Sequence, residues 1–153
     1  METHEQKKRR LYGKRYFKEY NSILEKLQKN GDPKRDLLSI AETDDFIAKS
    51  PDFSLLISKK LLFPDKEGLK SLITDNVKCQ DQPFYLLNAL SRDCGALKLS
   101  SLHDFNLDFH FYDDSSGIIT LTAVSYKEKI LLDFYIENDV QYLEVELYRG
   151  DGV

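Results

Sequence analysis

An alternation of apolar and polar side chains on both sides of Asn138-Asp139 limits the folds open to this chain more than any other pattern in it. Such alternation is typical of antiparallel strands that bury one face and expose the other. Asn-Asp suits a two-residue hairpin loop, which fixes the pairing of the flanking strands. Phe134 then lies opposite Leu143 on one face, and Asp133 lies opposite Glu144 on the other. A slip of one residue would turn the apolar side chains toward water, so the register is well determined.

Two further turns extend this hairpin toward the middle of the chain. A turn at Lys127-Glu128 would place Leu121 beside Phe134, and a turn over residues 113–117 would add a first strand. Together these turns predict a four-stranded antiparallel β-meander over about residues 105–148, with its apolar side chains on one face.

The first part of the chain, about residues 5–95, carries the signals of helices. Apolar and tyrosine side chains recur at helical spacing from about residue 5 to residue 29, where Asn30-Gly31 provides a stop. Residue pairs that end in proline and short apolar periods predict further helices over about residues 33–42, 51–62, 66–75 and 83–95. The pattern of segment 51–62 fits a buried helix or a strand, and its length favours a helix.

These elements predict a single α+β domain over residues 1–153, with several N-terminal helices packed on the apolar face of the C-terminal meander. Its longest apolar runs are too short to cross a bilayer, and the charged N-terminus is not followed by an apolar segment, so we expect neither membrane insertion nor a secretory signal. Cys79 and Cys94 are too few for a disulfide scaffold and lack metal-ligand spacing, which favours a cytoplasmic protein.

Motifs of catalysis and cofactor binding are absent from the sequence. It contains no glycine-rich phosphate loop, no G-x-S-x-G, no H-E-x-x-H and no C-x-x-C. We therefore predict no catalytic residue, no metal and no cofactor, and we expect a protein that is not an enzyme. A small-molecule ligand is not favoured either.

The net charge of −4 conceals a strong asymmetry. Residues 1–35 hold eleven Lys and Arg against five Asp and Glu, a net charge of +6, so the remainder carries −10. The stretch from Lys7 to Lys18, with Tyr12 and Tyr16 between its bases and Tyr20 just beyond, could contact the phosphates of a nucleic acid. We favour the alternative that these tyrosines dock on the body and the bases pair with its acids, so nucleic acid is not the expected partner.

The polar face of the meander gathers the candidate binding residues. Exposed tyrosines are favoured anchors at protein interfaces, and surrounding carboxylates attract a basic partner. Two like charges that face each other, Asp133 and Glu144, destabilise a sheet by up to about 1 kcal/mol, so something beyond folding could offset them. The predicted partner-binding residues are Asp108, His110, Asp133, Tyr135, Tyr142, Glu144, Glu146 and Tyr148.

Size, charge and this face together suit a small inhibitor or immunity-type protein that neutralises a basic partner such as a toxin nuclease, by surface character alone. The alternative without a binding function is a sheet face that is simply exposed to solvent. A metal or catalytic site on Asp108, His110, Asp133 and Glu144 is disfavoured, because ligands spread over a flat sheet do not converge. Two other functions stay open: an α+β domain with a ligand-binding or enzymatic pocket on the apolar face, and a nucleic-acid-associated adaptor that uses the basic N-terminal helix.

Overall fold

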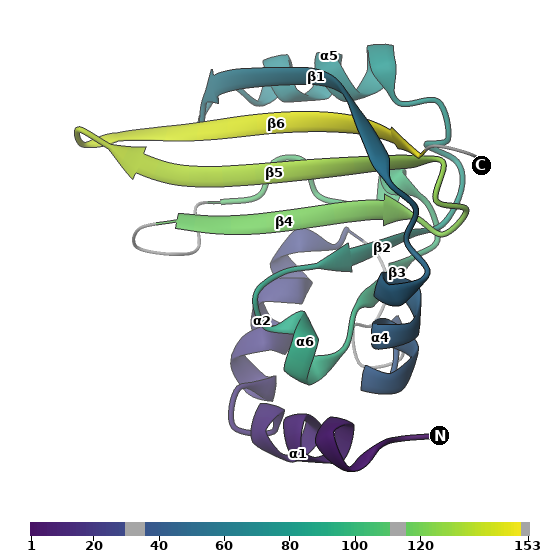
Figure 1. Cartoon of the computed structure of the whole chain (residues 1–153). Helices are drawn as coiled ribbons and strands as arrows, with labels where there is room; N and C mark the ends of the chain where they lie inside the picture. The colour runs from purple at the N-terminus through teal and green to yellow at the C-terminus, as the bar shows by residue number, and fades with distance from the viewer. Residues whose placement is uncertain (30–35, 111–115, 151–153) are drawn as a thin grey trace.

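The computed structural model describes residues 1–29, 36–110 and 116–150, which fold as an α+β protein with a six-stranded antiparallel sheet (Figure 1). The order of the strands across the sheet is β1-β6-β5-β4-β2-β3. The strands are β1 (Phe53–Leu62), β2 (Phe84–Leu87), β3 (Leu97–Leu99), β4 (Ser116–Ala123), β5 (Glu128–Glu137) and β6 (Val140–Gly150). The helices are α1 (His4–Gly13), α2 (Phe17–Leu27), α4 (Ile40–Ala48), α5 (Lys66–Asn76), α6 (Ser91–Cys94) and the 3₁₀ helix η1 (Leu102–Asp104).

The β5–β6 hairpin has the register that the sequence predicts. Phe134 pairs with Leu143 and Asp133 pairs with Glu144. Asn138 and Asp139 both adopt positive φ angles, 53° and 63°, as a type I′ turn requires. A local turn and a strict alternation were therefore enough to fix this part of the sheet.

The β4–β5 connection differs from the predicted two-residue turn. The loop comprises residues 124–127, and Leu121 pairs with Ile130 rather than with Phe134. The partner moves by four positions, an even number, so Leu121 keeps its place on the apolar face. Glu128, assigned to the turn by the sequence, begins β5 because its buried carboxylate accepts hydrogen bonds from two backbone N–H groups.

The predicted first strand of the meander is wrong in its described part, and β2 occupies its place beside β4. Phe105 forms an isolated bridge with Gln28, and a turn follows in which the Asn106 side chain accepts a hydrogen bond from the backbone N–H of Asp108. This turn lets Phe105 and Phe109 both enter the core. Residues 111–115, where the sequence predicts a turn, lie outside the described residues.

For segment 51–62 the sequence favours a helix over a strand, and the structure shows the strand. The single helix predicted over segment 83–95 is present only in its last part. The first forms β1, paired with β6, and the second forms β2 followed by the short helix α6. A β-bulge between Leu55 and Ile57 interrupts the alternation of β1, so its apolar residues do not show a two-residue period in the sequence. Pairing with distant strands decides the structure of such short apolar runs.

The helices agree with the sequence prediction in part. Helix α5 confirms the prediction for residues 66–75, whereas the long helix predicted over residues 5–29 is divided into α1 and α2 by a turn after Gly13. A Cβ atom at Gly13 would lie 2.1 Å from the Asp93 carbonyl oxygen, so this close packing requires glycine. Helix α4 begins after a Ser39 capping box, later than the helix predicted over residues 33–42, and residues 30–35 lie outside the described residues.

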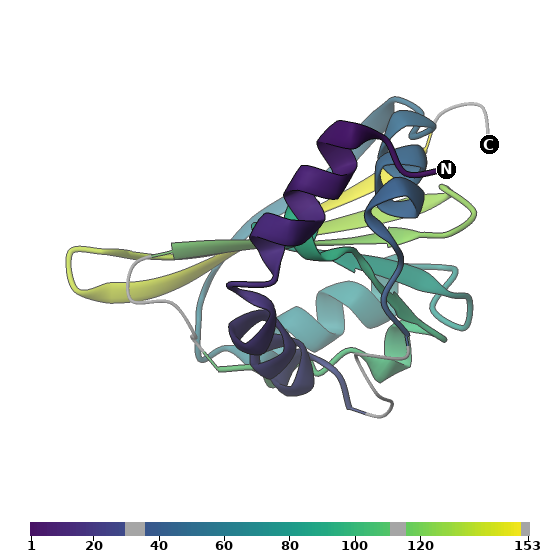
Figure 2. The ribbon, with the colours of Figure 1, turned by 90° about the horizontal axis from the view of Figure 1, so that it is seen from below.

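The core lies on one face of the sheet, as predicted. Helices α2 and α5 and the segment that contains Phe105 and Phe109 pack on this face (Figure 2). Helix α4 lies on the opposite face but covers only its β2 end, where the Phe46 ring contacts the rings of Tyr85 and Tyr126 at centroid distances of 4.5 and 4.6 Å. The opposite face of β1, β6, β5 and β4 is therefore left open by α4.

Candidate protein-binding face of the sheet

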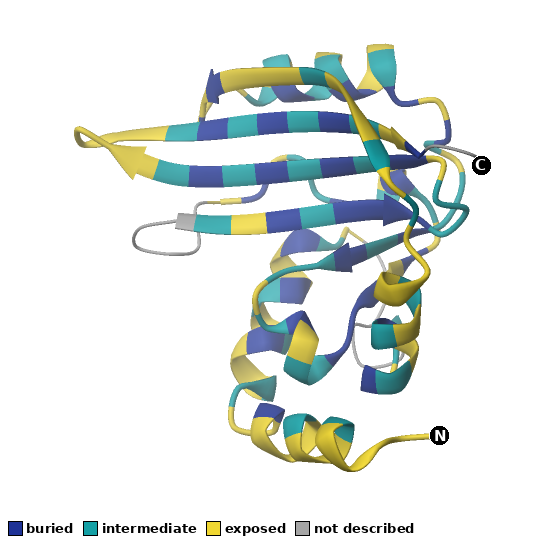
Figure 3. Cartoon of the chain, viewed as in Figure 1, coloured by how far each residue is buried: buried dark blue, intermediate teal, exposed yellow. Residues whose placement is uncertain are grey.

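We call the open side of β1, β6, β5 and β4 the outer face. Along β5 and β6, buried side chains of the core alternate with partly exposed side chains of the outer face (Figure 3). Six of the eight predicted binding residues lie there on two adjacent strands, so the structure brings them together. They are Asp133 and Tyr135 on β5, and Tyr142, Glu144, Glu146 and Tyr148 on β6.

The other two predicted residues, Asp108 and His110, do not belong to this face. Their segment covers the core side of the sheet, and the Asp108 carboxylate forms an ion pair with Lys70 Nζ of α5 at 3.0 Å. They were predicted to join the face because residues 105–111 read as a strand with strict alternation, whereas the chain forms a turn at Asn106.

The outer face also contains three residues that the sequence prediction missed. Lys60 and Leu62 of β1 pair with Glu144 and Tyr142 of β6, and Ile118 of β4 pairs with Asp133. Leu62 and Ile118 are 55% and 52% exposed, so each presents aliphatic surface that a partner could bury. Lys60 and Leu62 were missed because β1 was predicted to be helical. The error in the β4 register is an even number of residues and leaves Ile118 on the same face, so Ile118 could have been included from the alternation alone.

The charges on the outer face are unequally compensated. The Tyr135 hydroxyl donates a hydrogen bond to Glu144 Oε1 at 3.1 Å, and Lys60 lies across from Glu144 on the next strand. The Asp133 carboxylate, by contrast, forms no hydrogen bond or ion pair with any described residue. Burial raises the pKa of the Asp133 carboxyl, and the nearby Glu144 and Glu146 carboxylates raise it further.

Lys60 also contacts the two central tyrosines. Its ammonium lies 4.1 Å from the ring centroid of Tyr142 and 5.7 Å from that of Tyr135, within cation–π range, and 3.9 Å from a Glu137 carboxylate oxygen. A hydrogen bond with the Tyr135 hydroxyl raises the pKa of Lys60. The amine therefore holds the two rings together and neutralises part of the acidic charge, while Asp133 stays uncompensated.

The resulting surface places two carboxylates on its middle strands, beside two tyrosines and between two exposed aliphatic side chains. Leu62, Tyr142 and Tyr135 lie in one row across β1, β6 and β5. The next row across the four strands contains Lys60, Glu144, Asp133 and Ile118. Exposed tyrosines and apolar side chains are common anchors at protein interfaces, where polar groups lie close to them. Within the described part of the chain, no three His, Cys, Asp or Glu side chains gather in a way that could hold a metal ion.

A cleft of about 330 Å³ lies at the start of β5, away from the β5–β6 hairpin turn, and Glu128 is one of its lining residues. Glu128 Oε1 accepts hydrogen bonds from the backbone N–H groups of Lys78 and Cys79 at 2.8 and 2.7 Å. Burial, together with the Glu128 carboxylate, raises the pKa of the Cys79 thiol to about 12. The thiol is therefore protonated at neutral pH and is a poor nucleophile, and Glu128 serves to hold the loop after α5.

The apolar face of the sheet is filled by core side chains at the place where the alternative prediction puts a ligand pocket. Phe109, Leu121 and Phe134 are at most 1% exposed, and the Phe109 and Phe134 ring centroids lie 5.9 Å apart.

Among the described helices, none combines the length and the apolar character needed to cross a bilayer. No family model, curated protein or solved structure matches this chain.

Proposed function

We propose that this chain is a non-enzymatic protein-binding module whose outer face docks on a basic protein partner. The observation that carries the proposal is the meeting of exposed aliphatic, tyrosine and uncompensated acidic side chains on an area of sheet that α4 leaves open. Leu62 on β1 and Ile118 on β4 would be buried at the two sides of the interface, because burying their exposed surface is favourable. Tyr135 and Tyr142 would anchor beside them at a small cost in side-chain entropy, since Lys60 already orders their rings.

The carboxylates would provide selectivity and a fast encounter. Asp133 faces Glu144 directly, and a Lys or Arg of the partner placed between them would relieve their repulsion. Their field, with that of Glu146, would attract a basic surface and would weaken as salt is added. A flat surface of this kind suits a protein better than a small molecule, which requires a concave site.

Within this class, we favour a small inhibitor of the immunity type that neutralises a basic toxin such as a nuclease. An inhibitor needs little more than one rigid surface of high complementarity, and a sheet face supported by a continuous core is rigid. The acidic charge of residues 36–153 matches the basic surface that a nuclease presents to nucleic acid. An inhibitor on such a surface would lower the activity of the enzyme in proportion to its amount.

The proposal can be tested by affinity capture from an extract of the native host. The wild-type chain is compared with Asp133→Lys/Glu144→Lys on the outer face and with the matched control Glu67→Lys/Asp75→Lys on α5, which changes the net charge equally. We expect wild type and control to retain the same basic protein, and the outer-face variant to lose at least tenfold in affinity, the cost of one desolvated charge contact.

A second variant separates anchoring from charge. Leu62→Ser/Ile118→Ser leaves the net charge unchanged and should also weaken capture, while the melting temperature verifies that each variant is folded. If a folded outer-face charge variant kept full affinity for the partner, the outer face would not be the binding surface. If the captured partner is an enzyme, its activity should fall as the chain is added.

A further inference from the structure

The basic N-terminal segment is exposed in a way that its sequence did not predict. Of the three tyrosines expected to dock on the body, only Tyr20 is buried, whereas Tyr12 is 50% exposed and Tyr16 is partly exposed. Leu11 beside them is 46% exposed. A nucleic-acid partner was disfavoured because the tyrosines were expected to pack on the body. Tyr12 does not pack there and remains available for contact.

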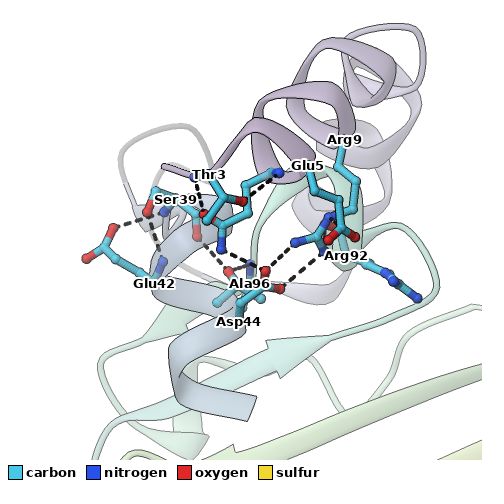
Figure 4. Close-up of polar contacts among 10 residues, drawn as sticks. Thr3, Glu5, Arg9, Ser39, Glu42, Asp44, Arg92 and Ala96 are labelled. Atoms are coloured by element: carbon cyan, nitrogen blue, oxygen red, sulfur yellow. Dashed lines mark hydrogen bonds and ion pairs between the residues drawn. The ribbon is translucent and has the colours of Figure 1, made fainter. Parts of the chain in front are cut away.

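Two arginines of α1 are used in structure. Arg9 forms an ion pair with Asp44 of α4 and donates a hydrogen bond to the Arg92 carbonyl oxygen at 3.1 Å, and these contacts fasten α1 to the body (Figure 4). Arg10 pairs with Glu2 at 2.9 Å, and Glu5 lies 4.0 Å from Arg9. The acidic side chains of α1 and its N-terminal flank are thus occupied by these two arginines.

The lysines of the segment are left without such partners. The ammonium groups of four exposed lysines form no hydrogen bond or ion pair with any residue that the structure describes; they belong to Lys7, Lys8, Lys14 and Lys18. The expectation that the bases pair with acids of the body therefore holds for Arg9 and not for these lysines. They form a cationic surface on a chain whose remainder is strongly acidic.

Aromatic rings lie within this cationic surface. The Tyr12 and Tyr16 ring centroids are 5.6 Å apart, and their hydroxyl oxygens are 3.3 Å apart. The Arg15 guanidinium lies 5.6 Å from the Tyr12 ring centroid. Lys8, Tyr12 and Arg15 are spaced by four and three residues, which places them along one side of α1 and its C-terminal turn.

We propose that the surface formed by α1 and the turn into α2 binds single-stranded nucleic acid. Unpaired bases would stack on the Tyr12 and Tyr16 rings, and Lys7, Lys8 and Lys14 would neutralise the phosphates between them. A duplex offers no free base face for such stacking. An anionic membrane is the less suitable occupant, because an interfacial helix needs an apolar face and α1 exposes a single aliphatic side chain, Leu11, among its described residues.

This surface is separate from the outer face. Helix α1 lies at the end of the molecule far from the β5–β6 hairpin, which leaves both surfaces accessible at once (Figure 1). The acidic charge of the remaining residues repels phosphates and confines contact to the segment. Nucleic-acid binding is thus independent of the proposed protein partner and does not need it.

The test measures the fluorescence anisotropy of end-labelled oligonucleotides of about 12 nucleotides, poly-dT and poly-U, titrated with the full chain. We expect binding at about 50 mM salt, with the logarithm of the affinity falling against the logarithm of the salt concentration at a slope of about −2, as expected for roughly three phosphate contacts. A duplex of the same length should bind more weakly. Comparison of the two oligonucleotides distinguishes DNA from RNA as the preferred source of the phosphates and bases.

Two variants test the surface itself. Lys8→Glu/Lys14→Glu should weaken binding at least tenfold and flatten the salt slope, whereas the matched control Lys59→Glu/Lys98→Glu on β1 and β3 should bind nearly as wild type. Tyr12→Ser should weaken binding about tenfold without changing the slope, since it removes stacking and no charge.

Three outcomes would overturn the inference. They are no oligonucleotide binding at low salt, equal losses in the test and control lysine variants, and binding to anionic phosphatidylserine vesicles without binding to either oligonucleotide. Far-UV circular dichroism and the melting temperature establish that each variant is folded, so a loss of binding reports on the surface.

Discussion

Replacing Asp133 by Asn should make the protein more stable at neutral pH. Asp133 faces Glu144 across the β5–β6 ladder and is partly buried, and its carboxylate forms no hydrogen bond or ion pair with any described residue. Two like charges in directly opposed positions cost about 0.2–1 kcal/mol. The amide of Asn removes the repulsion from Glu144 and Glu146 and can donate a hydrogen bond to Glu144. We therefore expect a gain of about 0.5–1 kcal/mol in the free energy of unfolding.

Glu144→Gln provides the matched control. It removes the repulsion between Asp133 and Glu144 but leaves that from Glu146, and it also removes the charge that accepts the Tyr135 hydroxyl hydrogen bond and faces Lys60. The gain should accordingly be smaller than for Asp133→Asn and close to zero. The double variant should gain less than the sum of the two single changes, because either substitution alone abolishes the repulsion.

The pH dependence follows from the raised pKa of Asp133, caused by burial first and then by Glu144 and Glu146. An acid whose pKa is higher in the folded than in the unfolded state destabilises the protein above the folded pKa, and this effect disappears as the pH falls below both values. The advantage of Asp133→Asn should therefore be full at pH 7 and shrink toward pH 4.

Urea unfolding followed by far-UV circular dichroism at both pH values measures these changes, with an unchanged m-value as the sign that the unfolded state is unaffected. A loss of more than about 0.5 kcal/mol for Asp133→Asn at pH 7 would refute the reasoning, because it would mean that the Asp133 charge has a stabilising partner within the fold.

Three other perturbations test the fold. Glu128→Ala leaves the N–H groups of Lys78 and Cys79 without their acceptor and should cost about 2–3 kcal/mol in urea unfolding; no loss would mean that water replaces the carboxylate. Gly117→Ala would bring a Cβ within 2.3 Å of the Phe134 ring, so a loss of about 1–3 kcal/mol is expected in the same assay, and a neutral result would contradict the packing. At pH 8, the Cys79 thiol, whose pKa is about 12, should stay unmodified by iodoacetamide in the native protein and react in urea, as peptide mass spectrometry would show; rapid native labelling would contradict its burial.

The parts of the fold that could be predicted from sequence depend on local signals. The β5–β6 hairpin joins two alternating strands through a turn that only a few residues permit, so its register follows from about twenty neighbouring positions. Helix α5 also follows from local signals. The Asp65 side chain caps its first turn, and the helical spacing of its apolar residues marks its extent.

The parts that could not be predicted depend on distant partners. β1 pairs with β6 from the other end of the chain, and its bulge at Leu55 hides the two-residue period in the sequence. Because β1 was predicted to be a helix, the predicted binding face was also incomplete. Its β5 and β6 residues were placed correctly relative to one another, but Lys60 and Leu62 could not be found without the β1–β6 pairing.

The basic segment shows a different limit. Helical spacing alone cannot tell a tyrosine that packs on the body from one that lies on the surface. Tyr20 and Tyr12 lie on the same predicted stripe, yet the turn after Gly13 redirects the chain and leaves Tyr12 exposed. Only the tertiary structure distinguishes the two.

The central proposal, that the outer face contacts a basic protein, is tested most directly by site-specific photo-crosslinking in the native host. A benzoylphenylalanine residue replaces Tyr142 at the centre of the face or, as a control, Lys98, an exposed residue on β3 at the far edge of the sheet. We predict a crosslink to one basic protein from position 142 and none from position 98. Equal crosslinking from both positions, or a partner captured from position 98 alone, would contradict the proposal.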